Sequence, residues 1–267
     1  MNNIIPLNRA WLWILLSTLM ISGSALMGFL YYLHVNEMRI NDSRNRIIAL
    51  IQQCDQKESS LKTAFLAQLL DLSTDKPTNL YQYNIAQNEK KLIKCPLIKT
   101  AAIRKVPPNS LYVQYQSRVP IAYLGDYTNT AMDGEGYLFP LRPFFIPKRL
   151  PLIYFGIERC WGQTIANDDR FILAMEILKQ LEAMTSESLY VNKIDVSDAF
   201  SESDGNRQIV VALSSNQGKI YLLRLNSTRY REGLHNFRLM IGRLQQSAVV
   251  DLRISKLAFV IICNDCS

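Results

Sequence analysis

One stretch of the sequence constrains the chain more than any other: residues 10–33 contain no charged side chain. An α-helix rises about 1.5 Å per residue, so 24 residues are enough to cross a hydrocarbon core of about 30 Å. Aromatic side chains, which favour membrane interfaces, flank this stretch at both ends. They are Trp11, Trp13, Tyr31 and Tyr32. We therefore predict a single transmembrane helix over residues 10–35, with these four side chains at the membrane interface.

A cleaved signal peptide is the alternative interpretation of this stretch, because Gly23-Ser24-Ala25 resembles a cleavage site. The eight residues that follow, 26–33, are still apolar, which favours an uncleaved anchor. The positive charges do not decide the orientation. Arg9 precedes the helix and three arginines follow it, but large domains are translocated largely regardless of charge. The three are Arg39, Arg44 and Arg46.

The bulk composition indicates a folded chain with room for about two domains in its 267 residues. Hydrophobic residues make up 48% of the chain and charged residues 20%, which excludes a mainly disordered protein. The net charge of +7 suits an anionic lipid surface or an acidic protein partner. No run of five basic residues occurs, so nucleic acid is not predicted as a partner.

Residues that could carry catalysis or bind a metal are scattered. The five cysteines are an odd number, and Cys263 with Cys266 forms a Cys-x-x-Cys pair that we interpret as structural or incidental. The sequence contains neither a Gly-x-Ser-x-Gly motif nor a phosphate-binding glycine loop. Acidic pairs at residues 133/135 and 168/169 fall in a turn and at a helix start, and the two histidines, His34 and His235, are isolated. We predict no enzyme activity, cofactor or metal.

The segment after the helix predicts a small α+β unit. Residues 36–46 are polar and of mixed charge, which is typical of a linker. A short strand at 47–51 and helices near 61–72 and 83–93 are followed by strands at 98–104 and 111–115. Between the last two strands, Pro107-Pro108-Asn109-Ser110 predicts a hairpin turn. The predicted order is therefore β-α-α-β-β.

The remaining residues predict a second, β-rich region with mainly antiparallel strands and at least two helices. The Asp-Gly-Glu-Gly sequence at 133–136 predicts a tight turn. Asp168 or Asp169 is expected to cap a helix with a buried apolar stripe, and Thr228 is expected to cap a second helix. Strands are expected at 189–196, 209–213, 219–225 and 249–254. The predicted fold class is α+β.

Several residues then carry a resemblance to a known family. Between residues 96 and 122 they are Pro96, Ile98, Ala101, Ile103, Arg104, Pro108, Leu111, Val113, Arg118, Pro120 and Ala122. Further on they are Asp133, Gly136 and Phe139, then Leu150-Pro151, then Asp251-Leu252-Arg253. In order and spacing, this set resembles a divergent member of the FtsQ (DivIB) family of bacterial cell-division proteins.

The resemblance implies a domain organisation. Residues 1–9 would be a cytoplasmic tail and 10–35 the transmembrane helix, followed by the linker at 36–46. Residues 47–120 would form a POTRA domain, and 121–267 the β domain of the family. The bulk of the chain would then be periplasmic, with the protein in the inner membrane at the division septum.

The last predicted strand, 257–262, is apolar at every position, so we expect both of its faces to be covered. The cover could be the protein's own helices or a partner strand added at the sheet edge. In the FtsQ family this region binds the bitopic proteins FtsB and FtsL. The predicted partner-binding residues are Arg253, Ile254, Leu257, Phe259 and Ile261. Here Ile254 to Leu257 replace the Tyr and the nearby Gly that are usual in the family.

The implied function is that of a divisome scaffold, which links early and late division proteins during septum formation. Two other functions stay open at this point. One is a POTRA-containing protein of export or outer-membrane assembly, and the other is a membrane-anchored extracytoplasmic enzyme. Other divisome proteins could also bind through the POTRA domain.

Overall fold

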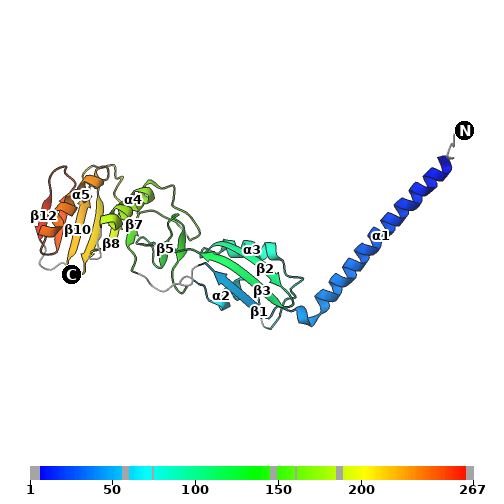
Figure 1. Ribbon diagram of the computed structural model, residues 1–267. Coiled ribbons are helices and arrows are strands. Elements are labelled where there is room, and N and C mark those ends of the chain that lie inside the picture. Colours follow the sequence, from blue (N-terminus) through cyan, green and yellow to red (C-terminus); the bar gives the residue numbers. More distant parts are fainter. Residues whose placement is uncertain are drawn as a thin grey trace. The chain divides into compact units, whose positions relative to one another are not determined.

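The computed structural model describes residues 7–55, 60–73, 75–144, 149–159, 161–184 and 189–262, with side chains from residue 11 onward. Cys160, Cys263 and Cys266 lie outside these ranges. The fold is α+β, with one long apolar helix near the N-terminus and a β-rich, mostly antiparallel region that carries several helices (Figure 1). By internal contacts the chain divides into two compact units. The first comprises residues 1–53, 63–91 and 101–114, and the second comprises 54–62, 92–100 and 115–267.

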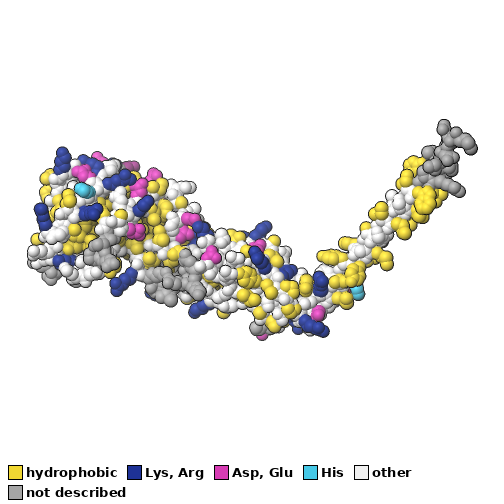
Figure 2. All heavy atoms as spheres, in the orientation of Figure 1, with side chains coloured by type: hydrophobic (Ala, Val, Ile, Leu, Met, Phe, Trp, Pro, Cys, Tyr) yellow, Lys and Arg dark blue, Asp and Glu magenta, His cyan; other side chains and the backbone are white. Residues whose placement is uncertain are grey.

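Helix α1, Leu7–Asn41, is long and apolar enough to cross a membrane. Its apolar side chains face outward along its length (Figure 2), and none of its most apolar window is buried against the protein. Four hydroxyl groups within the helix each donate a hydrogen bond to the backbone carbonyl three residues earlier. These hydroxyl groups therefore have a hydrogen-bond partner where water is absent. The donors are Ser17, Thr18, Ser22 and Ser24, at 2.9–3.1 Å. Trp11, Trp13, Tyr31 and Tyr32 are all exposed on this helix.

The helix does not end with its apolar residues but continues through the predicted linker to Asn41. A 3-10 turn, η1 (Ser43–Asn45), follows and is capped by Asp42, whose carboxylate accepts from the backbone N–H of Arg44 at 2.9 Å. With 35 residues and about 1.5 Å per residue, α1 is longer than the roughly 20 residues that a bilayer core requires. The last two turns of α1 therefore extend beyond the apolar stretch, and several of their side chains are polar.

The buried side chain of Asn79 ties the end of α1 to the rest of the first unit. Its Nδ2 donates to the carbonyl of Ile40 at 2.7 Å and to that of Arg39 at 3.1 Å. Its Oδ1 accepts from the backbone N–H of Tyr81 at 2.8 Å, and the Arg39 guanidinium lies 5.4 Å from the centroid of the Tyr81 ring. The last carbonyls of a helix have no partner within the helix. One amide thus satisfies carbonyls at the helix end and fixes the following loop.

We expect Asn79→Ala to lower the free energy of unfolding by about 1–3 kcal/mol, because it leaves buried polar groups without partners. Thermal denaturation of the full chain in detergent, followed by circular dichroism, measures the loss. The control is Asn84→Ala, which removes an amide that accepts the N–H of Gln87 near the start of a different helix, at a more exposed position. An equal or smaller loss for Asn79→Ala would show that the tie is not stabilising.

A three-stranded sheet follows α1, with the strand order β1-β3-β2. The elements are β1 (Ala49–Cys54), α2 (Thr63–Leu69), α3 (Ile85–Lys94), β2 (Ile98–Val106) and β3 (Ser110–Ser117). Strand β3 alternates between buried and half-buried residues at every position, as a central strand with one covered face does. The predicted hairpin between β2 and β3 is confirmed. The first strand begins at Ala49, two residues later than predicted.

The second sheet has nine strands in the order β12-β11-β10-β9-β8-β7-β4-β5-β6. They are β4 (Ala122–Leu124), β5 (Thr130–Met132), β6 (Leu138–Pro140), β7 (Leu152–Tyr154), β8 (Leu189–Asp195), β9 (Ile209–Ser215), β10 (Ile220–Leu225), β11 (Ala248–Leu252) and β12 (Phe259–Ile262). Five of the neighbouring pairs are antiparallel, whereas β4–β7, β7–β8 and β10–β11 are parallel. The pair β8–β9 contains a bulge between Val191 and Lys193.

Two helices share a core with one face of this sheet: α4 (Asp169–Met184) and α5 (Tyr230–Met240). Helix α4 contacts β8, and α5 contacts β10 and β11 (Figure 1). At Gly233 the helix lies so close to the sheet that a Cβ would come within 2.8 Å of the Leu225 side chain. The apolar stripe of α4 is buried as predicted.

The starts of the two helices test the predicted caps. Asp168 caps α4, since its Oδ1 accepts from the backbone N–H of Arg170 at 2.9 Å. The Thr228 cap is wrong: the N-cap residue of α5 is Arg229. The Thr228 hydroxyl donates to the carboxamide oxygen of Asn226 at 2.7 Å, and the same oxygen accepts from the N–H groups of Thr228 and Arg229, so Thr228 belongs to the turn before the helix.

A buried ion pair holds the turn between β5 and β6. Arg118 Nη1 lies 2.6 Å from an Asp133 carboxylate oxygen, with side-chain exposures of 11% and 9%, and the guanidinium lies 3.5 Å from the centroid of the Tyr137 ring. The other Asp133 oxygen accepts from the N–H groups of Glu135 and Tyr137 at 3.0 and 2.9 Å. Gly136 has φ +71° in this turn, which a glycine adopts without strain. The predicted Asp-Gly-Glu-Gly turn is confirmed.

Candidate functional site

The predicted partner-binding residues lie together at one end of the nine-stranded sheet. Phe259 and Ile261 are on β12, while Arg253, Ile254 and Leu257 are in the turn between β11 and β12. The predicted strand at 249–254 ends at Leu252, and the predicted strand at 257–262 begins at Phe259. The structure thus divides the five residues between a strand and the turn before it.

Strand β12 is the last in the strand order, with β11 as its neighbour. Residues directly opposite each other in an antiparallel pair project from the same face of the sheet. Val260 is opposite the buried Val250 and Ile262 is opposite the buried Ala248, on the face that carries the helices. The alternate residues of β12 project from the other face, namely Phe259 opposite Asp251 and Ile261 opposite Val249. The strand is therefore apolar on both faces.

All four side chains of β12 are exposed: 56% at Phe259, 38% at Val260, 65% at Ile261 and 61% at Ile262. Within the described part of the chain, the protein's own helices do not cover this strand, so of the two covers expected for it only a partner strand stays open as a prediction. The core under α5 ends at β11, where Ala248 and Val250 are buried, and the sheet extends one strand further. Apolar side chains clustered at a sheet edge mark an interaction site.

Val260 and Ile262 belong to this exposed set but were missed as candidate residues. The sequence does carry a signal for them, because the strand is apolar at every position instead of alternating. We call the four residues of β12, with Ile254 and Leu257, the β12 edge. Ile254 and Leu257 are 53% and 55% exposed, respectively.

The turn that leads into β12 is held in place by polar contacts. Arg253 donates to both carboxylate oxygens of Asp251, from Nε at 3.0 and 3.1 Å and from Nη2 at 2.8 Å. These hydrogen bonds lower the pKa of Asp251 and raise that of Arg253. Glu232 on α5 accepts from the Ser255 hydroxyl at 2.7 Å, which lowers the pKa of that carboxyl.

Arg253 therefore has a role inside the protein. Its side chain bonds to Asp251, and its Nη1 donates to the carbonyl of Gly205 at 3.3 Å. It is only partly exposed, in contrast to the apolar residues around it. Of the five predicted contact residues, Arg253 is the one whose geometry favours positioning of the turn.

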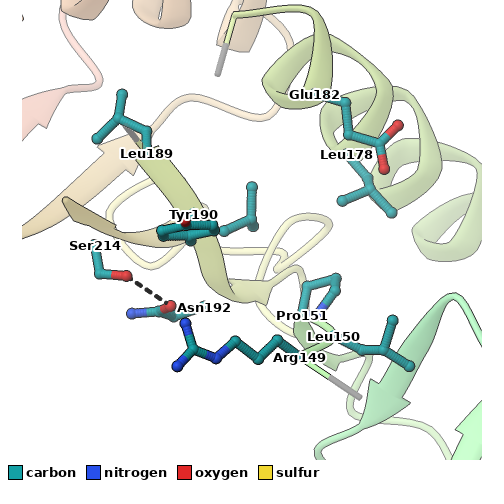
Figure 3. Close-up of a pocket in the computed structure, with 10 residues that line it drawn as sticks. Arg149, Leu150, Pro151, Leu178, Glu182, Leu189, Tyr190, Asn192 and Ser214 are labelled. Atoms are coloured by element: carbon teal, nitrogen blue, oxygen red, sulfur yellow. Dashed lines mark hydrogen bonds between the residues drawn. The ribbon is translucent and has the colours of Figure 1, made fainter. Parts of the chain in front are cut away.

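A cleft of about 500 Å³ lies beside β8 and α4 of the second unit (Figure 3). Leu178 and Glu182 of α4 form one side, and Arg149, Tyr190 and Asn192 lie across from them. Asn192 is fixed by the Ser214 hydroxyl at 3.0 Å. Among the lining residues that the structure describes there is no histidine, cysteine or hydroxyl paired with a base, so none of these residues forms an arrangement for nucleophilic catalysis.

The acidic pairs considered for catalysis have structural roles. The Asp133 carboxylate pairs with Arg118 and accepts hydrogen bonds in the turn described above, and Asp168 caps α4. No cluster of three metal-binding side chains occurs among the described residues. Cys54 and Cys95 are free thiols, and burial raises the pKa of Cys95. A raised thiol pKa disfavours the reactive thiolate.

The fold and the site define a class: an α+β protein with one N-terminal helix of membrane-spanning length and an exposed apolar edge strand. No protein-family model matches the chain, and no curated protein matches it significantly.

Proposed function

We propose that this chain is a single-pass inner-membrane scaffold of bacterial cell division, of the FtsQ (DivIB) type. Its β12 edge binds an extended segment of bitopic division proteins of the FtsB/FtsL type. The N-terminus is cytoplasmic and both folded units are periplasmic. The observation that carries the proposal is the edge strand itself, which is apolar and exposed on both faces.

Strand addition is the mode of binding that this edge favours. An edge strand offers backbone groups to an incoming strand, and side chains on the two faces then provide specificity. A partner strand beside β12 would cover Phe259 and Ile261 on one face and Val260 and Ile262 on the other. The fixed turn at residues 253–256 presents the strand in one conformation, which reduces the entropy cost of binding.

The arrangement of the first sheet supports the family part of the proposal. The element order β1-α2-α3-β2-β3 agrees with the strand-helix-helix-strand-strand order expected of a POTRA domain. The residues that carry the resemblance also have consistent structural roles. Arg118 and Asp133 form the buried pair, Gly136 occupies the positive-φ position of the turn, and Phe139 is fully buried.

Localisation in dividing cells tests the proposal. A fluorescent fusion of the full chain is expected to concentrate at the septum during constriction. A uniform signal around the envelope would overturn the division role and favour a general export function. The matched control is the same fusion with the Phe259→Glu change. This variant is expected to keep its membrane location but lose septal enrichment if the partner recruits it through β12.

A further inference from the structure

A second surface of the same unit has features of a ligand site. Two adjoining cavities, of about 400 and 490 Å³, share Tyr127, Thr128 and Thr130. The first is completed by Leu138, Arg159 and Trp161. The second extends along β4 and includes Asn129 and Arg142. Together they form a groove, with Tyr127 at its middle, that is separate from the β12 edge in sequence and in lining residues. We call it the Trp161 groove.

The aromatic side chains of the groove are exposed but fixed. Trp161 is 53% exposed, and its Nε1 donates to the Thr130 hydroxyl at 3.0 Å. The Tyr127 hydroxyl donates to the Ile157 carbonyl at 3.3 Å and accepts from the Arg159 N–H at 3.0 Å. Because protein groups satisfy the polar atom of each ring, the exposed part is the apolar ring surface. Fixed, exposed aromatic rings are common anchors of binding sites.

Residues 155–159, which precede Trp161 in the chain, are held by three side chains. Asp126 accepts from the backbone N–H groups of Phe155 and Gly156, at 2.8 and 3.2 Å. Arg170 of α4 donates to the carbonyls of the same two residues at 2.9 and 3.1 Å. Tyr127 holds the next residues through the contacts given above. Such preorganisation lowers the cost of ordering a site when a ligand binds.

The charge of the groove has one sign. Arg142 lines one cavity and Arg159 the other, both exposed, and the described residues that line the two cavities include no aspartate or glutamate. The Asn129 carboxamide is bonded to the backbone of Arg142 at 2.7 and 3.0 Å, and the Thr130 hydroxyl to Trp161 and to the Thr128 carbonyl, so these polar groups fix the groove. The groove thus offers mainly ring surfaces for stacking and two guanidinium groups for carboxylates.

We propose that the Trp161 groove binds a polysaccharide whose sugars carry carboxylates. Sugar rings have apolar C–H faces that stack on aromatic side chains, and Trp161 and Tyr127 present such ring surfaces. The two arginines would each bind a carboxylate, one on either side of Tyr127. Given the periplasmic placement of the proposed function, on which this inference rests, the polysaccharide is cell-wall glycan from which the peptides have been removed, because its muramic acid units then carry free lactyl carboxylates.

Titration of the purified full chain in detergent tests the site. The probe is soluble glycan strands, freed of their peptides by an amidase, and binding is measured by isothermal calorimetry. Trp161→Ala is expected to weaken binding at least about tenfold, the effect of losing one anchor residue. Arg142→Gln with Arg159→Gln is expected to weaken it and to flatten its dependence on salt. Trp161→Phe, which keeps a ring, is expected to restore most of the affinity.

Control variants separate this site from the rest of the protein. Tyr190→Ala removes an exposed aromatic residue from the cleft of Figure 3 and is expected to leave glycan binding unchanged. Phe259→Glu is also expected to leave it unchanged, so failure of the β12 proposal and failure of this one can be told apart. Melting temperatures of all variants establish that they are folded.

Three results would overturn the proposal. One is an unchanged affinity for Trp161→Ala when the variant is folded. Another is equal binding of uncharged N-acetylglucosamine oligomers, since the arginines would then have no role. The third is binding of the released peptides without the glycan, which would make the groove a peptide site.

Discussion

Phe259→Glu is expected to weaken binding of an FtsB/FtsL-type partner by at least about 2 kcal/mol, or about 30-fold in Kd. The Phe259 side chain is exposed in the free protein and would be covered by an added strand. A glutamate there would have to lose its hydration without gaining an ion pair, which is strongly unfavourable. Binding of the purified partner to the immobilised full chain, measured by interferometry, gives the ratio of dissociation constants. Leu257→Glu, in the preceding turn, is expected to weaken binding in the same direction.

The exposure of the side chain makes this variant a clean test. Because Phe259 is 56% exposed, the change is expected to leave the melting temperature nearly unchanged. The matched control is Ile48→Glu, which introduces the same charge at an exposed apolar residue of the first unit. If Phe259→Glu binds as tightly as Ile48→Glu and both are folded, β12 is not the binding edge.

Asp133→Ala is expected to lower the free energy of unfolding of the second unit by about 3–5 kcal/mol. The change leaves the Arg118 guanidinium buried without its nearest counter-ion, and it removes the acceptor of the Glu135 and Tyr137 N–H groups. The remaining acid, Glu135, lies 3.8 Å from Arg118 Nη1 and is exposed, and the Nε of Arg118 has no hydrogen-bond partner, so little is left to offset the loss. Urea denaturation of the full chain in detergent, followed by circular dichroism, measures the effect.

The control for Asp133→Ala is a neighbouring ion pair that is exposed. Lys99 Nζ lies 2.6 Å from a Glu135 carboxylate oxygen, with side-chain exposures of 39% and 61%. Lys99→Ala is expected to cost no more than about 1 kcal/mol, because solvent screens this pair and both groups remain hydrated without it. Similar losses for the two variants would show that burial does not set the strength of the Asp133 pair.

Features coded by neighbouring residues were predictable from the sequence. The uncharged run at 10–33 predicts α1, the Pro-Pro-Asn-Ser sequence predicts the β2–β3 hairpin, and the Asp-Gly-Glu-Gly sequence predicts the β5–β6 turn. Each depends on local hydrophobicity or on backbone conformations that only certain residues adopt. The stripe of α4 was predictable for the same reason, since helical periodicity is visible within a few turns.

The candidate site was only partly predictable. Apolar residues at every position of 257–262 identified a strand that needs covering, and Phe259 and Ile261 are indeed exposed. The sequence could not tell whether the protein's own helices provide the cover. It also assigned Arg253 to the contact surface, whereas the fold pairs this side chain with Asp251. The neighbour of a strand depends on contacts between distant segments, which periodicity does not report.

By itself, the sequence determined the apolar helix, the turns and the helical stripes, because these depend on residues within one or two turns of each other. Only the tertiary structure decided the parallel pairings of β4 with β7 and of β10 with β11, the tie between Asn79 and the end of α1, and the position of β12 beyond the last helix-covered strand. These features join residues up to about forty positions apart along the chain, as in the hydrogen bond from Asn79 to Ile40. Whether such contacts form depends on how well the buried surfaces of the whole fold pack together, which no short stretch of sequence determines.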